Sequence, residues 1–146
     1  RGDLVVEVIA DGVHLDARTV AHVFALAAEH NVVLVTDAMA AAGMPDGQYR
    51  LGALDVTVEA GVAMLTGGTA IAGGTAHLLD VVRFAVEEAG VDLVRAVRAA
   101  SSVPAAVLGM QDRIGALAAG RRADVLLVDT RLSAVRVLRA GTVLRD

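Results

Sequence analysis

The sequence predicts an α/β fold that opens with a strand, a helix and a second strand. Two short runs, residues 4–9 and 32–36, are apolar almost throughout and rich in Val and Ile, which is typical of parallel strands buried on both faces. Between them, apolar residues recur at spacings of three and four up to about His30. Asp16 stands just before this pattern and is a residue type favoured at helix N-caps. Together these observations indicate a strand, helix, strand unit.

The rest of the chain alternates short strands and helices. Apolar residues separated by glycines and polar residues at 49–65 predict a small hairpin region of antiparallel strands. The glycine-rich segment 66–75 predicts a flexible loop before an amphipathic helix. Beyond the loop, the patterns predict three helices and then three strands, at residues 76–90, 92–100, 102–109, 124–129, 134–138 and 142–144.

The composition favours a folded protein and excludes several functions. The chain has 146 residues, of which 55% are hydrophobic and 21% charged, so it can bury a core. A net charge of -4 and an aromatic content of 2% argue against binding of nucleic acid. Glycine or charge interrupts every apolar run before the roughly 18 residues of a membrane span, so no membrane association is expected.

Two residue types are missing, and their absence narrows the chemistry. Without Cys there are no disulfides, thiolate nucleophiles or Cys-based zinc sites. All 13 basic residues are Arg, which excludes a Lys Schiff base and a phosphate-loop Lys. The lack of Cys leaves the compartment open, and a cytoplasmic location is the default expectation.

Polar residues that directly follow the two predicted parallel strands are candidate site residues, because ligands gather at the carboxyl ends of such strands. Asp37 ends the second strand, where a charge beside a core needs a partner, a metal or hydrogen bonds. In the segment Asp11-Gly12-Val13-His14, Gly allows a tight turn and His can donate to an anion or titrate near neutrality. Each could equally be an ordinary cap, turn or exposed loop residue.

The glycine loop could cradle an anion with backbone amides, although glycine-rich connections are also common as plain loops. Its spacing mimics a nucleotide phosphate loop, but Gly74 stands where the Lys should be, which excludes that function. The remaining histidines, His22, His30 and His77, lack the two-His spacing of a helical zinc motif and are interpreted as structural or solvated.

Segments 9–16, 34–39 and 68–74, in this order, resemble the N-acetylglucosamine-6-phosphate deacetylases. The tail, with Ser102-Val103-Pro104-Ala105-Ala106 and Ala123-Asp124-Val125, is similar to the wider amidohydrolase superfamily. The resemblance implies the C-terminal part of a (β/α) TIM-type barrel, comprising its last two strands, plus part of a small accessory β-sandwich. The implied domains are a partial barrel at 1–109, with a hairpin insertion near 49–65, and sandwich strands at 110–146.

The resemblance also implies the roles of individual residues. Asp37 corresponds to the catalytic carboxylate, and the implied substrate-binding residues are Asp11, Gly12, Val13, His14, Ile71, Ala72 and Gly73. His14 would contact the sugar phosphate, and residues 71–73 would act through backbone groups. The implied cofactor is a divalent metal, zinc or similar, with its ligands upstream and none in this chain. The implied partners are a small-molecule amino-sugar phosphate and further copies of the chain in a homo-oligomer.

The expected function is metal-dependent hydrolysis of N-acetylglucosamine 6-phosphate to glucosamine 6-phosphate and acetate. The chain starts without Met and runs straight into a strand, so it is expected to be a fragment that is inactive when isolated. Two alternatives remain open. The chain could be a non-catalytic module for sugar-phosphate binding or assembly, or it could belong to another cyclic-amide amidohydrolase that shares the tail.

Overall fold

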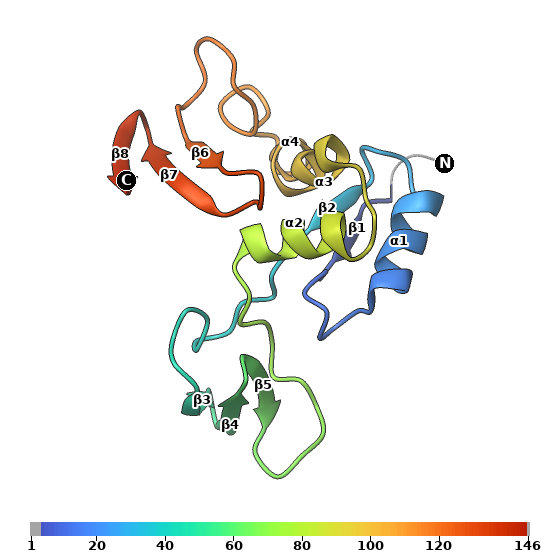
Figure 1. Ribbon diagram of the computed structural model, residues 1–146, viewed down its shortest axis with the longest axis vertical. Helices are drawn as coiled ribbons and strands as arrows, with labels where there is room; N and C mark the ends of the chain where they lie inside the picture. Colours follow the sequence, from blue (N-terminus) through green and yellow to red (C-terminus); the bar gives the residue numbers. More distant parts are fainter. Residues whose placement is uncertain (1–3, 146) are drawn as a thin grey trace.

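A computed structural model describes residues 4–145, and this part of the chain contains four helices and eight strands (Figure 1). The strands form three separate sheets, with the orders β1-β2, β3-β4-β5 and β6-β7-β8. In chain order the elements are β1 Val6–Val8, α1 Ala17–Leu26, β2 Val32–Leu34, β3 Gly47–Leu51, β4 Leu54–Glu59, β5 Val62–Leu65, α2 Leu78–Glu87, α3 Leu93–Ala100, α4 Ser102–Val107, β6 Val125–Val128, β7 Ala134–Arg139 and β8 Thr142–Arg145.

The first sheet confirms the predicted parallel pair. β1 and β2 are parallel, with Val6 opposite Val32 and Val8 opposite Leu34. The helices pack around this pair (Figure 1). Their contact surface is one apolar core, made of Val8, Ala10, Val20, Phe24, Val32, Leu34, Val81, Val82, Ala85, Val91, Ala96 and Ala99. Val20 and Phe24 recur at helical spacing on α1, which is why that helix presents one apolar stripe to the strands.

Helix α1 starts as predicted and ends earlier than predicted. The Asp16 carboxylate accepts hydrogen bonds from the backbone N–H groups of Arg18 and Thr19, which confirms the N-cap. The helix ends at Leu26 rather than near His30, because Ala27 already has an extended backbone conformation. The Arg95 guanidinium donates to the Ala27 carbonyl oxygen at 2.8 Å and so occupies one of the orphan acceptors at this helix end.

The predicted hairpin region is an antiparallel sheet of three strands, β3 to β5. It has a small core of its own, made of Met39, Ala41, Val56, Val58, Ala63 and Ala72. In Figure 1 this sheet lies at the lower end of the molecule, away from the helices. Met39 and Ala41, which follow β2, and Ala72, from the glycine loop, contribute to this core, so the sheet packs against residues close to Asp37.

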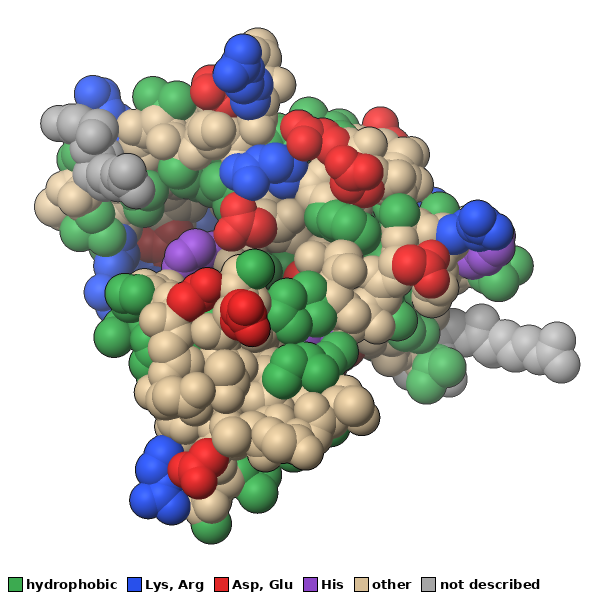
Figure 2. Space-filling view, turned by 60° about the horizontal axis from the view of Figure 1, so that its bottom comes forward, with side chains coloured by type: hydrophobic (Ala, Val, Ile, Leu, Met, Phe, Trp, Pro, Cys, Tyr) green, Lys and Arg blue, Asp and Glu red, His purple; other side chains and the backbone are tan. Residues whose placement is uncertain are grey.

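The last three strands form the sheet β6-β7-β8, as the tail pattern predicts. Arg83 of α2 contacts the turn before β7, because its guanidinium donates to the Leu132 carbonyl oxygen at 3.0 Å. The same side chain pairs with Asp80 one turn earlier. Many apolar side chains of this sheet remain exposed, among them Leu126, Leu127, Val135 and Leu144. Figure 2 shows apolar and charged side chains interspersed over one face of the molecule.

The predicted α/β class is confirmed. That the parallel strands belong to a barrel, that β6 to β8 belong to a sandwich, and that the domains divide at residue 109 stay predictions. No helix within residues 4–145 is long and apolar enough to cross a membrane.

Candidate active site

The register of the parallel pair brings the two predicted strand-end segments to the same level. Asp11 lies three residues beyond Val8, and Asp37 lies three residues beyond its partner Leu34. The backbone N–H of Val35 donates to the Val8 carbonyl oxygen, so the pairing extends past the strand ends. Both carboxylates follow the carboxyl ends of the parallel strands, and His14 lies within 2.8 Å of Asp11 and 3.8 Å of Asp37.

The glycine loop supplies a third segment at this edge. Ala38 and Gly74 form a parallel bridge, and the Gly74 N–H donates to the Asp37 carbonyl oxygen at 2.7 Å. In turn, the backbone N–H of Met39 donates a hydrogen bond to the Gly74 carbonyl oxygen at 3.0 Å. Gly74 is therefore bridged to the residues that follow β2, and Ile71 is bridged to Met64, so the prediction of a flexible loop is corrected for residues 71–74.

Two glycines allow this close approach. A Cβ atom at Gly74 would overlap the Thr36 carbonyl oxygen. Gly73 has a φ of +112°, which L side chains rarely adopt, and a Cβ atom there would meet the Asp37 carbonyl oxygen at 3.0 Å. The glycines thus serve backbone packing beside Asp37, a role that the sequence pattern leaves hidden.

The Asp11 carboxylate accepts three hydrogen bonds. Its Oδ1 atom accepts from the N–H groups of Val13 and His14 at 2.9 and 2.8 Å, and its Oδ2 atom lies 2.8 Å from Nδ1 of His14. The side chain is only 4% exposed. Burial raises the pKa of Asp11, but the hydrogen bonds from His14 and Val13 outweigh it and hold the pKa below the ordinary value of 3.8. Asp11 is therefore a carboxylate at neutral pH.

His14 extends from Asp11 towards Asp37. Its Nε2 atom lies 3.8 Å from Oδ2 of Asp37. The Asp37 side chain is 59% exposed, so its carboxylate can reach a ligand. Asp37 has a φ of +48°, in the left-handed region that Asp and Asn tolerate better than other side chains. The structure thus brings Asp11, His14 and Asp37 together, a chain of contacts that the sequence analysis did not predict.

The other predicted binding residues differ in what they can offer. Gly12 faces the ring of Phe84, which a Cβ atom would meet at 2.7 Å, so its role in the structure is packing. The side chains of Val13 and Ile71 are exposed. Ala72 is buried and its N–H donates to the Ala63 carbonyl oxygen, so that amide is not free for a substrate.

Within residues 4–145, no group of three or more His, Asp or Glu side chains is arranged to hold a metal ion. The described side chains alone therefore do not fit a metal site. His22, His30 and His77 are exposed and lie outside the Asp11, His14, Asp37 arrangement.

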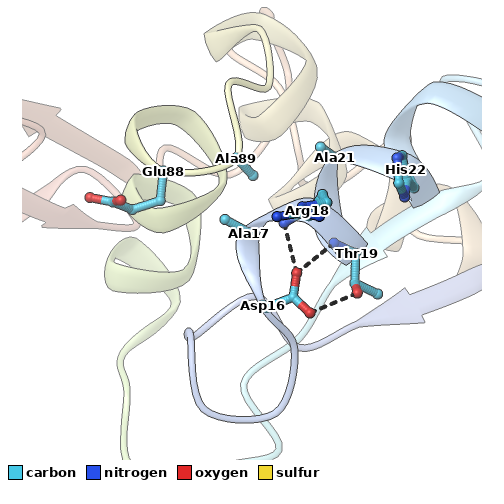
Figure 3. A pocket seen from close by; sticks show the side chains of 8 residues that line it. All are labelled: Asp16, Ala17, Arg18, Thr19, Ala21, His22, Glu88 and Ala89. Carbon is cyan, nitrogen blue, oxygen red and sulfur yellow. Dashed lines mark hydrogen bonds between the residues drawn. The ribbon is translucent and has the colours of Figure 1, made fainter.

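A separate groove of about 690 Å³ lies between the start of α1 and the end of α2 (Figure 3). Its lining residues are Asp16, Ala17, Arg18, Thr19, Ala21, His22, Glu88 and Ala89. None of the predicted site residues lines this groove. The Asp16 carboxylate is occupied by capping α1, and Glu88 points away from the other residues (Figure 3). We place the candidate site at the strand ends, where charged groups converge.

Comparison with known proteins relates the chain to sugar-phosphate deacetylases. The model of the amidohydrolase family matches residues 2–144. A putative N-acetylgalactosamine-6-phosphate deacetylase of Escherichia coli (strain K12) is 38% identical over 135 residues, which cover 92% of this chain and 80% of the relative. The N-acetylglucosamine-6-phosphate deacetylase of Vibrio furnissii is 38% identical over 143 residues, or 97% of this chain and 35% of the relative.

Solved structures give the same relationship. A mutant N-acetylglucosamine-6-phosphate deacetylase of Mycobacterium smegmatis, in complex with N-acetylglucosamine 6-phosphate, is similar with a TM-score of 0.93 and 42% identity. The deacetylase of Thermotoga maritima is similar with a TM-score of 0.89 and 35% identity. All of this chain is covered in both comparisons, but it spans only 39% and 40% of the solved chains.

Proposed function

The chain belongs to the amidohydrolase family, and from this premise we propose that it carries part of the active site of an N-acetylglucosamine-6-phosphate deacetylase. The observation that supports the proposal is that Asp37, beyond the end of β2, lies beside both His14, beyond the end of β1, and the glycine loop at Gly74. The proposed reaction is hydrolysis of the acetamide to glucosamine 6-phosphate and acetate. Assembly into a homo-oligomer and a cytoplasmic location belong to the same proposal.

Asp37 is the proposed proton carrier. As the oxygen of a water molecule bonds to the acetamide carbon, the Asp37 carboxylate takes a proton from that water. Asp37 then gives this proton to the amide nitrogen as the C–N bond breaks, and the amine leaves. The exposure of Asp37, and its place at a strand end with a φ of +48°, fit a side chain that must reach a bound substrate.

Three of the predicted binding residues, Val13, His14 and Ile71, would position the sugar phosphate. Val13 and Ile71 have exposed side chains that can contact a ligand, and Nε2 of His14 lies 3.8 Å from Oδ2 of Asp37. We propose that the reaction also uses a divalent metal ion, zinc or similar, which activates water when bound. No suitable group of metal-binding side chains occurs within residues 4–145. The groups that bind the metal would therefore come from outside these residues.

Hydrolysis of N-acetylgalactosamine 6-phosphate is the second candidate. The observation that favours it is that two relatives from Escherichia coli strains, each 38% identical over 135 residues, are named for this substrate. The two sugars differ in configuration at one hydroxyl group. Comparison of kcat/KM for both sugar phosphates decides between them.

The test is acetate release from N-acetylglucosamine 6-phosphate by the complete protein, with and without added divalent metal, before and after Asp37→Asn. Asn tolerates the left-handed backbone of this position, so the substitution removes the charge with little strain. Loss of a general base and acid lowers kcat by about 10²- to 10⁴-fold. The matched control is Asp55→Asn, since Asp55 is similarly exposed but lies on β4.

Full turnover by the Asp37→Asn variant would contradict the role of Asp37. Saturable binding of the sugar phosphate without any acetate release, by the unaltered and metal-supplied protein, would instead favour a non-catalytic binding module.

A further inference from the structure

Phe84 of α2 lies against the loop 11–14, although the two are far apart in the sequence. A Cβ atom at Gly12 would meet Cε2 of the Phe84 ring at 2.7 Å, and Cδ2 and Cζ at 3.3 Å. Apart from atoms of the neighbouring residues, these three are the closest, so the ring fills the space in which a side chain at Gly12 would stand. Gly12 has a φ of +77°, so the loop turns sharply at the point of contact.

The other hydrogen bonds of this loop are internal. The Asp11 carboxylate accepts from the backbone N–H groups of Val13 and His14, which closes a tight turn around Gly12. These bonds fix the shape of the loop but not its position over the core, because each of them joins residues of the loop itself. Phe84 makes contact from outside the loop, and it also packs against the core between the parallel strands and the helices. The ring therefore determines how closely the loop can approach that core.

Helix α2 also connects this loop with the glycine loop. The helix starts at Leu78, shortly after Gly74, whose backbone N–H donates to the Asp37 carbonyl oxygen. Further along the same helix, Phe84 contacts Gly12. One rigid element thus contacts the loop 11–14 and leads directly from the segment beside Asp37.

We propose that Phe84 is a positioning residue for binding of the sugar phosphate: its ring supports the loop 11–14 at Gly12 and so holds His14 in place for the substrate. This inference rests on the proposed function, in which His14 contacts the sugar phosphate. Without the full ring, the loop can settle into the space that is left, and its binding groups move with it.

Phe84→Leu in the complete, metal-supplied protein tests the proposal, because Leu lacks counterparts of Cε2 and Cζ. We expect KM for N-acetylglucosamine 6-phosphate to rise about tenfold and kcat to change by less than about threefold, since the binding loop shifts while Asp37 keeps its bond from Gly74. The matched control is Val86→Ala, which removes apolar volume from the same helix and core but none of the three atoms nearest to Gly12. This control should leave KM unchanged.

A double-mutant cycle tests the contact between the two residues. Gly12→Ala alone should raise KM, because the new methyl group strains the backbone at a positive φ and also meets the Phe84 ring. In the Phe84→Leu background the atom at 2.7 Å is gone, so the factor by which Gly12→Ala raises KM should be at least about fivefold smaller. Equal factors in both backgrounds would mean that the two residues act independently, and this would overturn the proposal.

The contact can also be measured without any variant. In the unaltered complete protein, we expect a nuclear Overhauser effect between the ring protons of Phe84 and the α-protons of Gly12, and its absence would overturn the contact. An unchanged KM in Phe84→Leu, or an equal rise in Val86→Ala, would overturn the positioning role.

Failure of the proposed function would give a different result. If the unaltered, metal-supplied protein releases no acetate, the proposed reaction is refuted, and the dissociation constant of the sugar phosphate, measured by calorimetry, replaces KM in the same comparison. A weaker binding of the sugar phosphate by Phe84→Leu, but not by Val86→Ala, would then still support the positioning role. Absence of any binding to the unaltered protein would overturn both proposals.

Discussion

Among single residues, Gly74 is the glycine at which an added side chain would meet the surrounding backbone most closely. Its space is taken by the Thr36 carbonyl oxygen, in the segment that joins β2 to Asp37. We expect Gly74→Ala to lower the free energy of unfolding by about 3 kcal/mol, because the backbone must move apart to admit a methyl group. Urea unfolding of the complete protein measures this. The control is Gly68→Ala, because a Cβ atom at Gly68 would lie 3.5 Å from its nearest neighbour, and this variant should shift the urea midpoint little. Equal shifts of the urea midpoint in both variants would refute the close approach at Gly74.

The lowered pKa of Asp11 predicts a pH dependence of stability. A carboxylate whose pKa is lower in the folded state stabilises the fold above its ordinary value of 3.8, and that stabilisation is lost as the pH falls through the lowered pKa. At neutral pH, Asp11→Asn should cost about 1 to 2 kcal/mol, as for loss of a charged hydrogen bond. Unfolding free energies from pH 7 to pH 2 should show this difference shrinking in acid. A constant difference would contradict it.

At this scale the sequence revealed the position of the site better than its internal contacts. Asp11, His14 and Asp37 were predictable because polar residues directly after buried strands are conspicuous. The contact of Gly12 with Phe84 joins residues 72 positions apart and leaves no local signal. Asp followed by His three residues later could have suggested a side-chain pair, but only the structure shows that Asp11 is fully engaged.

Among the elements, types were predictable and ends were not. Val-rich runs and helical spacing predict the parallel strands, the helices and the last three strands, whereas for 49–65 the pattern predicts only a hairpin region and not its three separate strands. The early end of α1 depends on Arg95 reaching Ala27 from another helix, which no local pattern contains. The glycine-rich pattern at 66–75 predicts a flexible loop, yet the small size of Gly73 and Gly74 permits close approach to residues 36–39, which follow β2.

Arg83 provides a prediction about how the last sheet is held. It donates to the Leu132 carbonyl oxygen, so Arg83→Met should loosen the β6–β8 sheet from α2. Because the side chain is partly exposed, we expect an effect of about 1 kcal/mol, or roughly fivefold faster amide exchange in β6 to β8. Hydrogen exchange followed by mass spectrometry measures it, with β1 and β2 as internal reference. Arg50→Met, at an exposed pair on β3, is the control, and equal acceleration by both would contradict the assigned contact.

In the molecule as a whole, the three sheets are small and much apolar surface stays open. On β6 the consecutive residues Leu126, Leu127 and Val128 are all exposed. Successive side chains of a strand point to opposite faces, so both faces of this sheet are uncovered. The sequence could predict the α/β class from local patterns. It could not show how much of each sheet is covered, because burial depends on contacts between distant segments.

This open surface predicts how the 146-residue chain behaves alone. Exposed apolar faces and unpaired strand edges favour association, so light scattering after size-exclusion chromatography should give a mass above the 14.9 kDa of one chain. The double substitution Leu126→Ser and Leu144→Ser should reduce that mass, since it removes apolar surface from the β6–β8 sheet. Leu117→Ser is the control, because Leu117 is equally apolar and 80% exposed but lies outside every strand. If the β6–β8 sheet mediates association, only the double variant lowers the measured mass. A monodisperse 14.9 kDa monomer of the unaltered chain would show that the uncovered sheet needs no partner.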